Sequence, residues 1–235
     1  MPDDRLAISV AEPPAPGSSP AGGLSPALES PASPGASRQL WSYRLVRPLV
    51  RPLIGTGITP NHLTTLRLLT GVAACAALAV GAPRWTLWGG VLWILSLLLD
   101  YADGELARLG HMATPFGHAY DYAVDTLVNV LFFAAMGMGL RGSQVGAWAI
   151  SMGLVSAGSV WVTSLLAEAL ERRLPPGGKA MEGWGGFAPE DLLYLVAPLA
   201  WANALLPLLC GATLGAPIAM AVIGWRLWRA RPAIR

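Results

Sequence analysis

Apolar residues fill most of the chain from residue 59 onward, in runs that are separated by Gly, Pro and charged residues. A helix that crosses a bilayer needs about 20 mainly apolar residues, and the pattern predicts six such helices. Their predicted ranges are 59–81, 85–108, 117–140, 145–170, 192–207 and 212–227. We expect the last two to be split near Cys210-Gly211 and kinked at Pro198 and Pro217. The pattern therefore predicts an all-α, polytopic membrane protein.

The polar segments define the domain organisation. Residues 1–38 are rich in Pro, Ala, Gly and Ser and predict a disordered tail, because such a segment cannot bury enough apolar surface to order itself. Residues 39–58 form a juxtamembrane segment, residues 59–230 the six-helix domain, and residues 231–235 a basic C-terminal tail.

The juxtamembrane segment has two explanations. Arg44, Arg47 and Arg51 recur at i, i+3 and i+7, and apolar residues recur between them. This pattern is typical of a basic helix lying in the membrane interface. A linker whose arginines only set the topology would show the same residues.

Composition supports the membrane class. The chain has 235 residues, is 54% apolar and 13% charged, and has a mean hydropathy of +0.49, which excludes an ordinary soluble domain. Cys75 and Cys210 lie in separate apolar runs, which indicates buried thiols rather than a disulfide framework or a zinc site.

Basic residues predict the orientation. Six crossings would place both termini on one side, and the loops of the opposite side hold only Arg84 and Arg141. Since Lys and Arg favour the inner side, we expect a multi-pass protein of the inner (plasma) membrane, with both termini and the active site cytoplasmic.

Five of the fourteen carboxylates lie within residues 100–125, at the end of one predicted span and the start of the next: Asp100, Asp103, Glu105, Asp121 and Asp125. Carboxylates at membrane depth are costly and usually mark a functional site. At 100° per residue, the first two aspartates share one helix face, and the last two share a face of the next helix. We expect facing helices to bring four carboxylates together.

Such a cluster suits hard cations. Oxygen-only ligands favour Mg²⁺, Mn²⁺ or Ca²⁺ over zinc, and two ions roughly 3.5–4 Å apart can clamp a diphosphate. On the Asp100 face, Gly104 and Ala107 leave room for a ligand, and Arg108 could hold a phosphate. Arg67, two turns inside the first span, needs an anionic partner or a polar cavity.

The chain resembles the CDP-alcohol phosphatidyltransferases, whose motif is D-x-x-D-G-x-x-A-R, eight residues, G-x-x-x-D-x-x-x-D. The matching residues are Asp100, Asp103, Gly104, Ala107, Arg108, Gly117, Asp121 and Asp125. The resemblance covers roughly residue 55 onward. It implies that family's six-helix fold, two Mg²⁺ or Mn²⁺ ions, a homodimer, and transfer of a substituted phosphate group from a CDP-linked lipid donor to a small alcohol acceptor. The reaction would release CMP. Membrane lipids are expected partners, and a nucleic acid is not.

The resemblance also implies residue roles. Asp100, Asp103, Asp121 and Asp125 would ligate the metals, with Asp121 and Asp125 sharing the second ion and Asp125 also serving as the base. The nucleotide and diphosphate would contact the remaining motif positions, with the cytidine on the small residues and Gly117 letting the two motif helices approach. These positions are Asp103, Gly104, Ala107, Arg108 and Gly117.

Three residues beside the motif are further candidates. Asn61 and Thr64 fit a P-N-x-x-T run that the family often has near its nucleotide pocket, although capping or backbone hydrogen bonds explain them equally well. His118 is adjacent to the motif; its expected role is structural or interfacial, with substrate contact as the alternative.

The carboxylates have two alternative explanations besides an enzyme: a purely structural role and cation transport. Ion pairs that serve only packing would leave most of the five acids unneutralised, since Arg108 and Arg67 are the only nearby cations. A carboxylate-lined cation transporter often shows an internal repeat, and this chain shows none. Within the enzyme reading, the donor is CDP-diacylglycerol or, alternatively, a CDP-amino-alcohol that reacts with diacylglycerol.

The acceptor is not readable from the chain. Family members that use glycerol phosphate as the acceptor usually have the sequence D-P-x-A-D-K, which residues 121–126 lack. Members that use inositol phosphate usually have arginines in their later helices, and the predicted fifth span has none. Arg172, Arg173 and Lys179 are candidate acceptor-binding residues, although topology alone explains them equally well.

Overall fold

The computed structural model describes residues 41–175, 178, 180–181 and 193–230. The predicted tails at 1–38 and 231–235, and Lys179, lie outside the described residues. Every regular element in the described part is a helix, which confirms the all-α class. The elements in chain order are α1 (Trp41–Val50), the 3₁₀ turn η1 (Arg51–Leu53), α2 (Pro60–Val80), α3 (Pro83–Leu109), α4 (Pro115–Gly139), η2 (Leu140–Gly142), α5 (Trp148–Glu171), α6 (Val196–Trp201) and α7 (Leu205–Arg229).

Among the described helices, α2, α3, α4, α5 and α7 are long and apolar enough to cross a membrane. The polytopic organisation is therefore confirmed, but the predicted count of six is not exact. Helix α6 has six residues, which span only about 9 Å at 1.5 Å per residue.

The predicted break at Cys210-Gly211 is wrong. Helix α7 continues through Gly211 and Pro217, and the chain instead turns at Ala202–Ala204, where Asn203 has φ of 53°. Asn is one of the few residues that tolerate the left-handed region. A glycine inside an apolar run does not end a membrane helix, because the freed backbone groups would find no water there.

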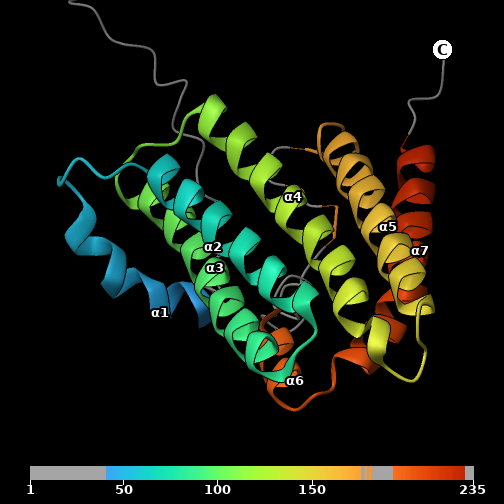
Figure 1. Cartoon of the computed structure of the whole chain (residues 1–235). Coiled ribbons are helices and arrows are strands. Elements are labelled where there is room, and N and C mark those ends of the chain that lie inside the picture. Colours follow the sequence, from blue (N-terminus) through green and yellow to red (C-terminus); the bar gives the residue numbers. More distant parts are fainter. Residues whose placement is uncertain (1–40, 176–177, 179, 182–192, 231–235) are drawn as a thin grey trace, which may run out of the picture. The chain divides into compact units, whose positions relative to one another are not determined.

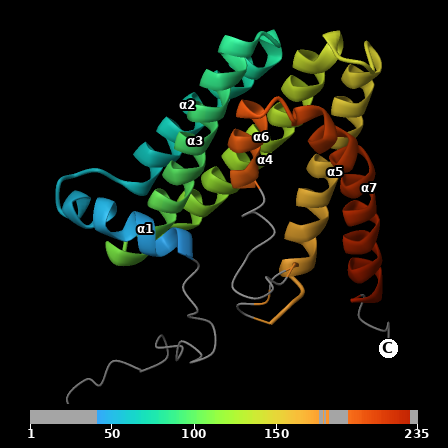
Figure 2. The ribbon, with the colours of Figure 1, turned by 90° about the horizontal axis from the view of Figure 1, so that it is seen from below.

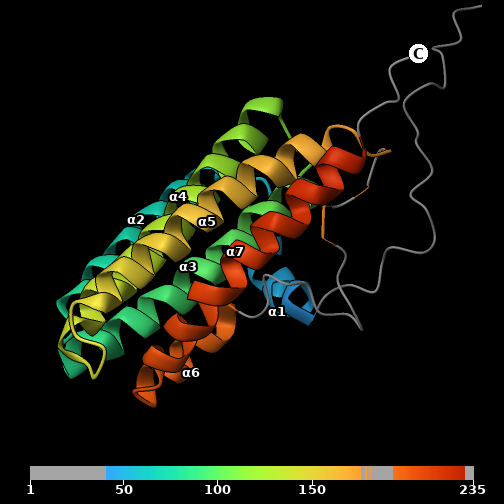
Figure 3. The same cartoon turned by 90° about the vertical axis from the view of Figure 1, so that its right-hand side faces the viewer.

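Helix α2 lies at the centre of the half of the bundle that carries the motif. It packs along α3 on one side and along α4 on the other, and α3 and α4 make few direct contacts (Figures 1 and 2). Helix α5 packs between α4 and α7, and α6 rests on α3, as the side view shows (Figure 3). The start of α2, the end of α3, the start of α4 and the end of α7 share one end of the bundle (Figure 1).

The largest apolar cluster joins these helices away from that end. Trp93 of α3 and Phe132 of α4 are almost fully buried, with ring centroids 4.3 Å apart. Helices α4 and α5 approach closely at two glycines: a Cβ on Gly137 would lie 2.6 Å from the Ala149 oxygen and 2.9 Å from Gly153 Cα. Small residues allow this backbone approach, as is common between membrane helices.

Five of the exposed tryptophans lie near the ends of the long helices. Trp85 and Trp88 begin α3, Trp148 begins α5, and Trp225 and Trp228 end α7. Indole rings prefer the headgroup level of a bilayer. Their placement is therefore typical of helices that end at the two membrane interfaces.

The juxtamembrane segment forms a helix that docks on α3. Val46 and Val50 of α1 are buried against Tyr101 and Leu106 of α3. Leu49, on the opposite side, has 66% of its surface exposed. Apolar packing thus holds α1 beside the end of α3 that carries the motif.

Candidate active site

Carboxylates from two helices come together at the shared end of the bundle. Asp100 and Asp103 lie on the last turns of α3, and Asp121 lies on the second turn of α4. One carboxylate oxygen from each of these three residues lies within 4.8 Å of the other two. The helical spacing therefore brings three of the four motif aspartates to one point.

A buried arginine of α2 joins this group. The Arg67 side chain is 3% exposed, and its Nη1 lies 2.5 Å from Asp100 Oδ1 and 3.2 Å from Asp121 Oδ1. Its Nη2 donates to Asp125 Oδ1 at 2.6 Å. The anionic partner that Arg67 requires is thus supplied by both motif helices. Arg67 therefore links α3 and α4 electrostatically at this end of the bundle.

Two further hydrogen bonds fix the remaining carboxylates. The Thr64 hydroxyl donates to Asp103 Oδ2 at 2.6 Å, and both side chains are almost fully buried. Asn129, one turn beyond Asp125 on α4, donates to Asp125 Oδ1 at 2.9 Å. Each aspartate therefore has a defined orientation without an ion.

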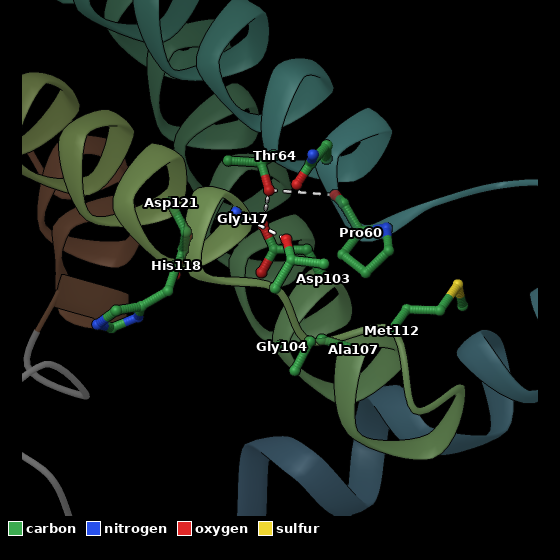
Figure 4. Close-up of a pocket in the computed structure, with 12 residues that line it drawn as sticks. Pro60, Thr64, Asp103, Gly104, Ala107, Met112, Gly117, His118 and Asp121 are labelled. Carbon is green, nitrogen blue, oxygen red and sulfur yellow. Dashed lines mark hydrogen bonds between the residues drawn. The ribbon is translucent and has the colours of Figure 1, made fainter.

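A cavity of about 180 Å³ opens on one side of the carboxylates (Figure 4). Asp103 and Asp121 line this cavity. So do six other residues that are motif positions or candidates beside the motif: Asn61, Thr64, Gly104, Ala107, Gly117 and His118. A Cβ on Gly104 would meet no atom within 4 Å, so this position faces open space. Figure 4 shows the small residues of α3 facing Met112 and the α2 residues across this space.

Gly117 relieves a different contact from the predicted one. A Cβ there would lie 3.2 Å from Asn61 Oδ1 and 3.0 Å from Thr114 Oγ1. Gly117 thus lets α4 approach α2 rather than α3, because α2 lies between the two motif helices.

A second cavity of about 270 Å³ lies on the other side of the carboxylates. It is lined by Asp100, Asp125, Asn129 and the aromatic residues Tyr101 and Tyr122, with Leu193 at its edge. Asp103, Gly104, His118 and Asp121 line both cavities. The two spaces therefore meet at the carboxylate group, and His118 lies at the junction.

The predicted basic contacts lie elsewhere. Arg108 is 54% exposed and donates to Glu105 Oε2 at 2.7 Å, and Arg47 of α1 lies 3.5 Å from the same carboxylate. Arg172 pairs with Glu168 on α5, and Arg173 donates to the Leu227 carbonyl. None of these arginines lines either cavity.

Sequence reasoning missed Asn129 and the two tyrosines. A signal for Asn129 was present, because it extends the i, i+4 series of Asp121 and Asp125 by one more turn. Tyr101 and Tyr122 carried no such signal. Their place in the second cavity depends on how α3 and α4 rotate against α2.

The ligand chemistry of the site fits a hard divalent ion. All three convergent groups offer carboxylate oxygens, which Mg²⁺ and Mn²⁺ prefer, and no thiol or imidazole belongs to this set. Asp125 lies one turn further along α4, outside this set, and shares Arg67 with Asp100 and Asp121.

Comparisons with known proteins agree with this geometry. The family model for CDP-alcohol phosphatidyltransferase matches residues 57–228. The phosphatidylinositol phosphate synthase of Corynebacterium glutamicum is 28% identical over 78% of this chain and 77% of its own length. The bifunctional IPC transferase and DIPP synthase of Aquifex aeolicus is 35% identical over 43% of this chain, and the match spans only 22% of that enzyme.

Solved structures share the fold. The phosphatidylinositol phosphate synthase of Mycobacterium tuberculosis with CDP-DAG bound has a TM-score of 0.60 and 18% identity, covering 82% of this chain and 99% of that chain. The same enzyme in complex with manganese and citrate has a TM-score of 0.59.

Proposed function

The chain belongs to the CDP-alcohol phosphatidyltransferase family, and from that premise we propose that it transfers a phosphatidyl group from CDP-diacylglycerol to a small alcohol in a metal-dependent reaction that releases CMP. The observation that carries this proposal is the meeting of two cavities at Asp103 and Asp121, whose carboxylate oxygens converge with that of Asp100. A group-transfer enzyme needs donor and acceptor on opposite sides of one reacting phosphorus.

Divalent ions fit this cluster. Asp100, Asp103 and Asp121 would hold one ion, and Asp121 with Asp125 would hold a second. Such ions neutralise the charge that builds on a diphosphate during phosphoryl transfer. The structure of the related Mycobacterium tuberculosis enzyme in complex with manganese and citrate supports this assignment.

The first cavity suits the nucleotide. Gly104 and Ala107 leave the backbone of α3 open on that side, and Gly104 has free space where a side chain would lie. Asn61 and His118 supply polar groups at the rim. Binding there would place the diphosphate of the donor beside the carboxylates.

The second cavity suits the acceptor. Asp125 lines it, and its Oδ1 is already held by Arg67 and Asn129. In the reaction the acceptor oxygen forms a bond to the β-phosphorus, the bond from that phosphorus to the bridging oxygen of CMP breaks, and Asp125 takes the hydroxyl proton. Tyr122 and Asn129 would orient the acceptor.

Arg108 is placed for a conditional role. It shares Glu105 with Arg47. Its half-exposed side chain could turn to the diphosphate once that charge arrives, since a bidentate Arg–phosphate contact is stronger than an exposed pair within one helix.

Orientation and assembly follow as part of the same proposal. The cluster lies at the end of the bundle where α2 begins and α7 ends. Arg108, Arg172, Arg173 and Arg226 lie towards this end, which favours a cytoplasmic active site in the inner membrane. A homodimer is proposed from the family resemblance alone.

A CMP-release assay tests the function. Purified protein with CDP-diacylglycerol and Mn²⁺ should release CMP when a panel of acceptors is added: serine, glycerol 3-phosphate, inositol, inositol phosphate and choline. EDTA should stop release, and Mg²⁺ or Mn²⁺ should restore it. Release that is indifferent to chelator would exclude the metal-dependent mechanism.

Two controls separate the alternatives. Release of CMP only from a CDP-amino-alcohol in the presence of diacylglycerol would favour the other donor class. Passage of Mn²⁺ into proteoliposomes without any CMP release would identify a transporter instead.

A further inference from the structure

Arg67 has no part in the family motif, yet it makes the closest contacts within the carboxylate cluster. It contacts Asp100, Asp121 and Asp125, whereas Asp103 is held by the neutral Thr64 hydroxyl. A cation with a 3% exposed side chain therefore already occupies the side of the cluster next to Asp125.

The cluster has two unequal sides. Asp100, Asp103 and Asp121 present oxygens close enough to share one ion. Asp125 does not belong to that set, and its Oδ1 lies 2.6 Å from Arg67 Nη2. Arg67 also contacts Asp100 and Asp121, but Asp103 of the first ion position is held by the neutral Thr64 hydroxyl. Both proposed ligands of the second position, Asp121 and Asp125, contact the guanidinium.

We propose that Arg67 holds the place of a second divalent ion beside Asp125, so that this ion enters only together with the diphosphate of the donor. The inference rests on the metal-dependent function proposed above. It adds an order of events: one ion binds to the free enzyme, and the second binds with the donor.

Formal charge supports this order. Four ionised carboxylates and Arg67 together carry −3, one divalent ion brings the group to −1, and a second would make it +1 in a membrane-embedded site. The two negative charges of a diphosphate return the group to −1. Because like charges a few ångströms apart repel strongly where water is scarce, the second ion is disfavoured until the donor supplies that charge.

Ion stoichiometry tests the proposal without relying on activity. Protein in detergent is titrated with Mn²⁺, and the free ion is measured by electron paramagnetic resonance, with and without CDP as the soluble diphosphate probe. Wild-type protein should bind one Mn²⁺ per chain alone and two with CDP. Arg67→Gln should bind two without CDP, whereas Arg67→Lys, which keeps the charge, should bind one.

Arg141→Gln is the matched control. Arg141 lies at the opposite end of the bundle and donates to the Ala79 and Met138 carbonyls. Its replacement should leave the stoichiometry at one without CDP and two with it, which would show that loss of any arginine is not sufficient.

Three results would overturn the inference: two Mn²⁺ ions on the wild-type protein without CDP, one ion even with CDP, or one ion on Arg67→Gln without CDP. The wild-type comparison decides the order of ion binding even if the Arg67 variants do not fold, and the Arg67 variants decide whether this arginine causes it. Absence of any Mn²⁺ binding, with or without CDP, would overturn the metal-dependent function as well, and so separates the two failures.

Discussion

The hydrogen bond from Thr64 to Asp103 provides a sharp test of the site, because valine replaces threonine with almost no change in shape. In Thr64→Val the donor to Asp103 Oδ2, now 2.6 Å away, is lost, and Asp103 is only 3% exposed. A hydrogen bond to a charged group contributes about 1.5–3 kcal/mol. At about 1.4 kcal/mol per decade, this corresponds to a factor of roughly 10–150. Removal of a partner that orients a metal ligand costs about 10–100-fold in affinity, which agrees.

The assay is a Mn²⁺ titration of the detergent-purified protein, with the metal concentration for half-maximal CMP release as a second readout. The dissociation constant for Mn²⁺ and the Mn²⁺ concentration for half-maximal CMP release should both rise about 10–100-fold in Thr64→Val. Thr70→Val is the control, because the Thr70 hydroxyl bonds only to the Leu66 and Arg67 carbonyls of its own helix. Equal Mn²⁺ affinity in the two variants would refute the reasoning that Thr64 orients a metal ligand.

Three further substitutions test other parts of the site and fold. Asp121→Asn should lower CMP release by at least about 100-fold, because loss of a residue that merely orients a metal ligand already costs up to about 100-fold. The variant should still insert into the membrane, and full activity would contradict the ligand assignment. Gly104→Trp should weaken CDP binding about 10–100-fold, as overpacking by 1–3 kcal/mol implies, with unchanged thermal stability, because Gly104 faces open space; unchanged affinity would move the nucleotide elsewhere. Gly137→Ala should lower the free energy of unfolding in detergent by about 1–3 kcal/mol, since its Cβ would press on Ala149. Gly158→Ala, which meets no atom within 4 Å, should not.

The carboxylate cluster was predictable because it depends mainly on local periodicity. Asp100 and Asp103 lie one turn apart near the end of α3, and Asp121 lies near the start of α4. A short connection between the two helices then returns all three to the same membrane depth. Spacing along the chain is enough to establish this, without knowledge of which helices touch.

The cation that pairs with these carboxylates was not predictable to the same degree. Its lone position inside an apolar helix showed that Arg67 needs an anion, but the partners follow from the packing of α2 between α3 and α4. The spacing places Arg108 on the Asp100 face, but it does not reveal the pairing of Arg108 with Glu105, three residues earlier on the same helix.

The end of α6 shows another limit of local signals. Gly211 and Asn203 are both plausible helix ends by residue type, and the sequence favoured the glycine. The structure uses Asn203, and Gly211 is the seventh residue of α7, inside an apolar helix where a break would leave backbone groups without hydrogen-bond partners.

Helix α2 sets the spacing of the site although it carries no residue of the motif. A Cβ on its Gly71 would lie 2.8 Å from Val128 of α4 and 3.0 Å from the Ser96 hydroxyl of α3. The same Ser96 hydroxyl donates to the Arg67 carbonyl at 3.2 Å. Because α3 and α4 make few close backbone contacts, their separation near the carboxylates depends in part on how closely each approaches this glycine. The distance between the two halves of the motif therefore depends on packing one turn below Arg67 as well as on the ion pairs of Arg67 itself.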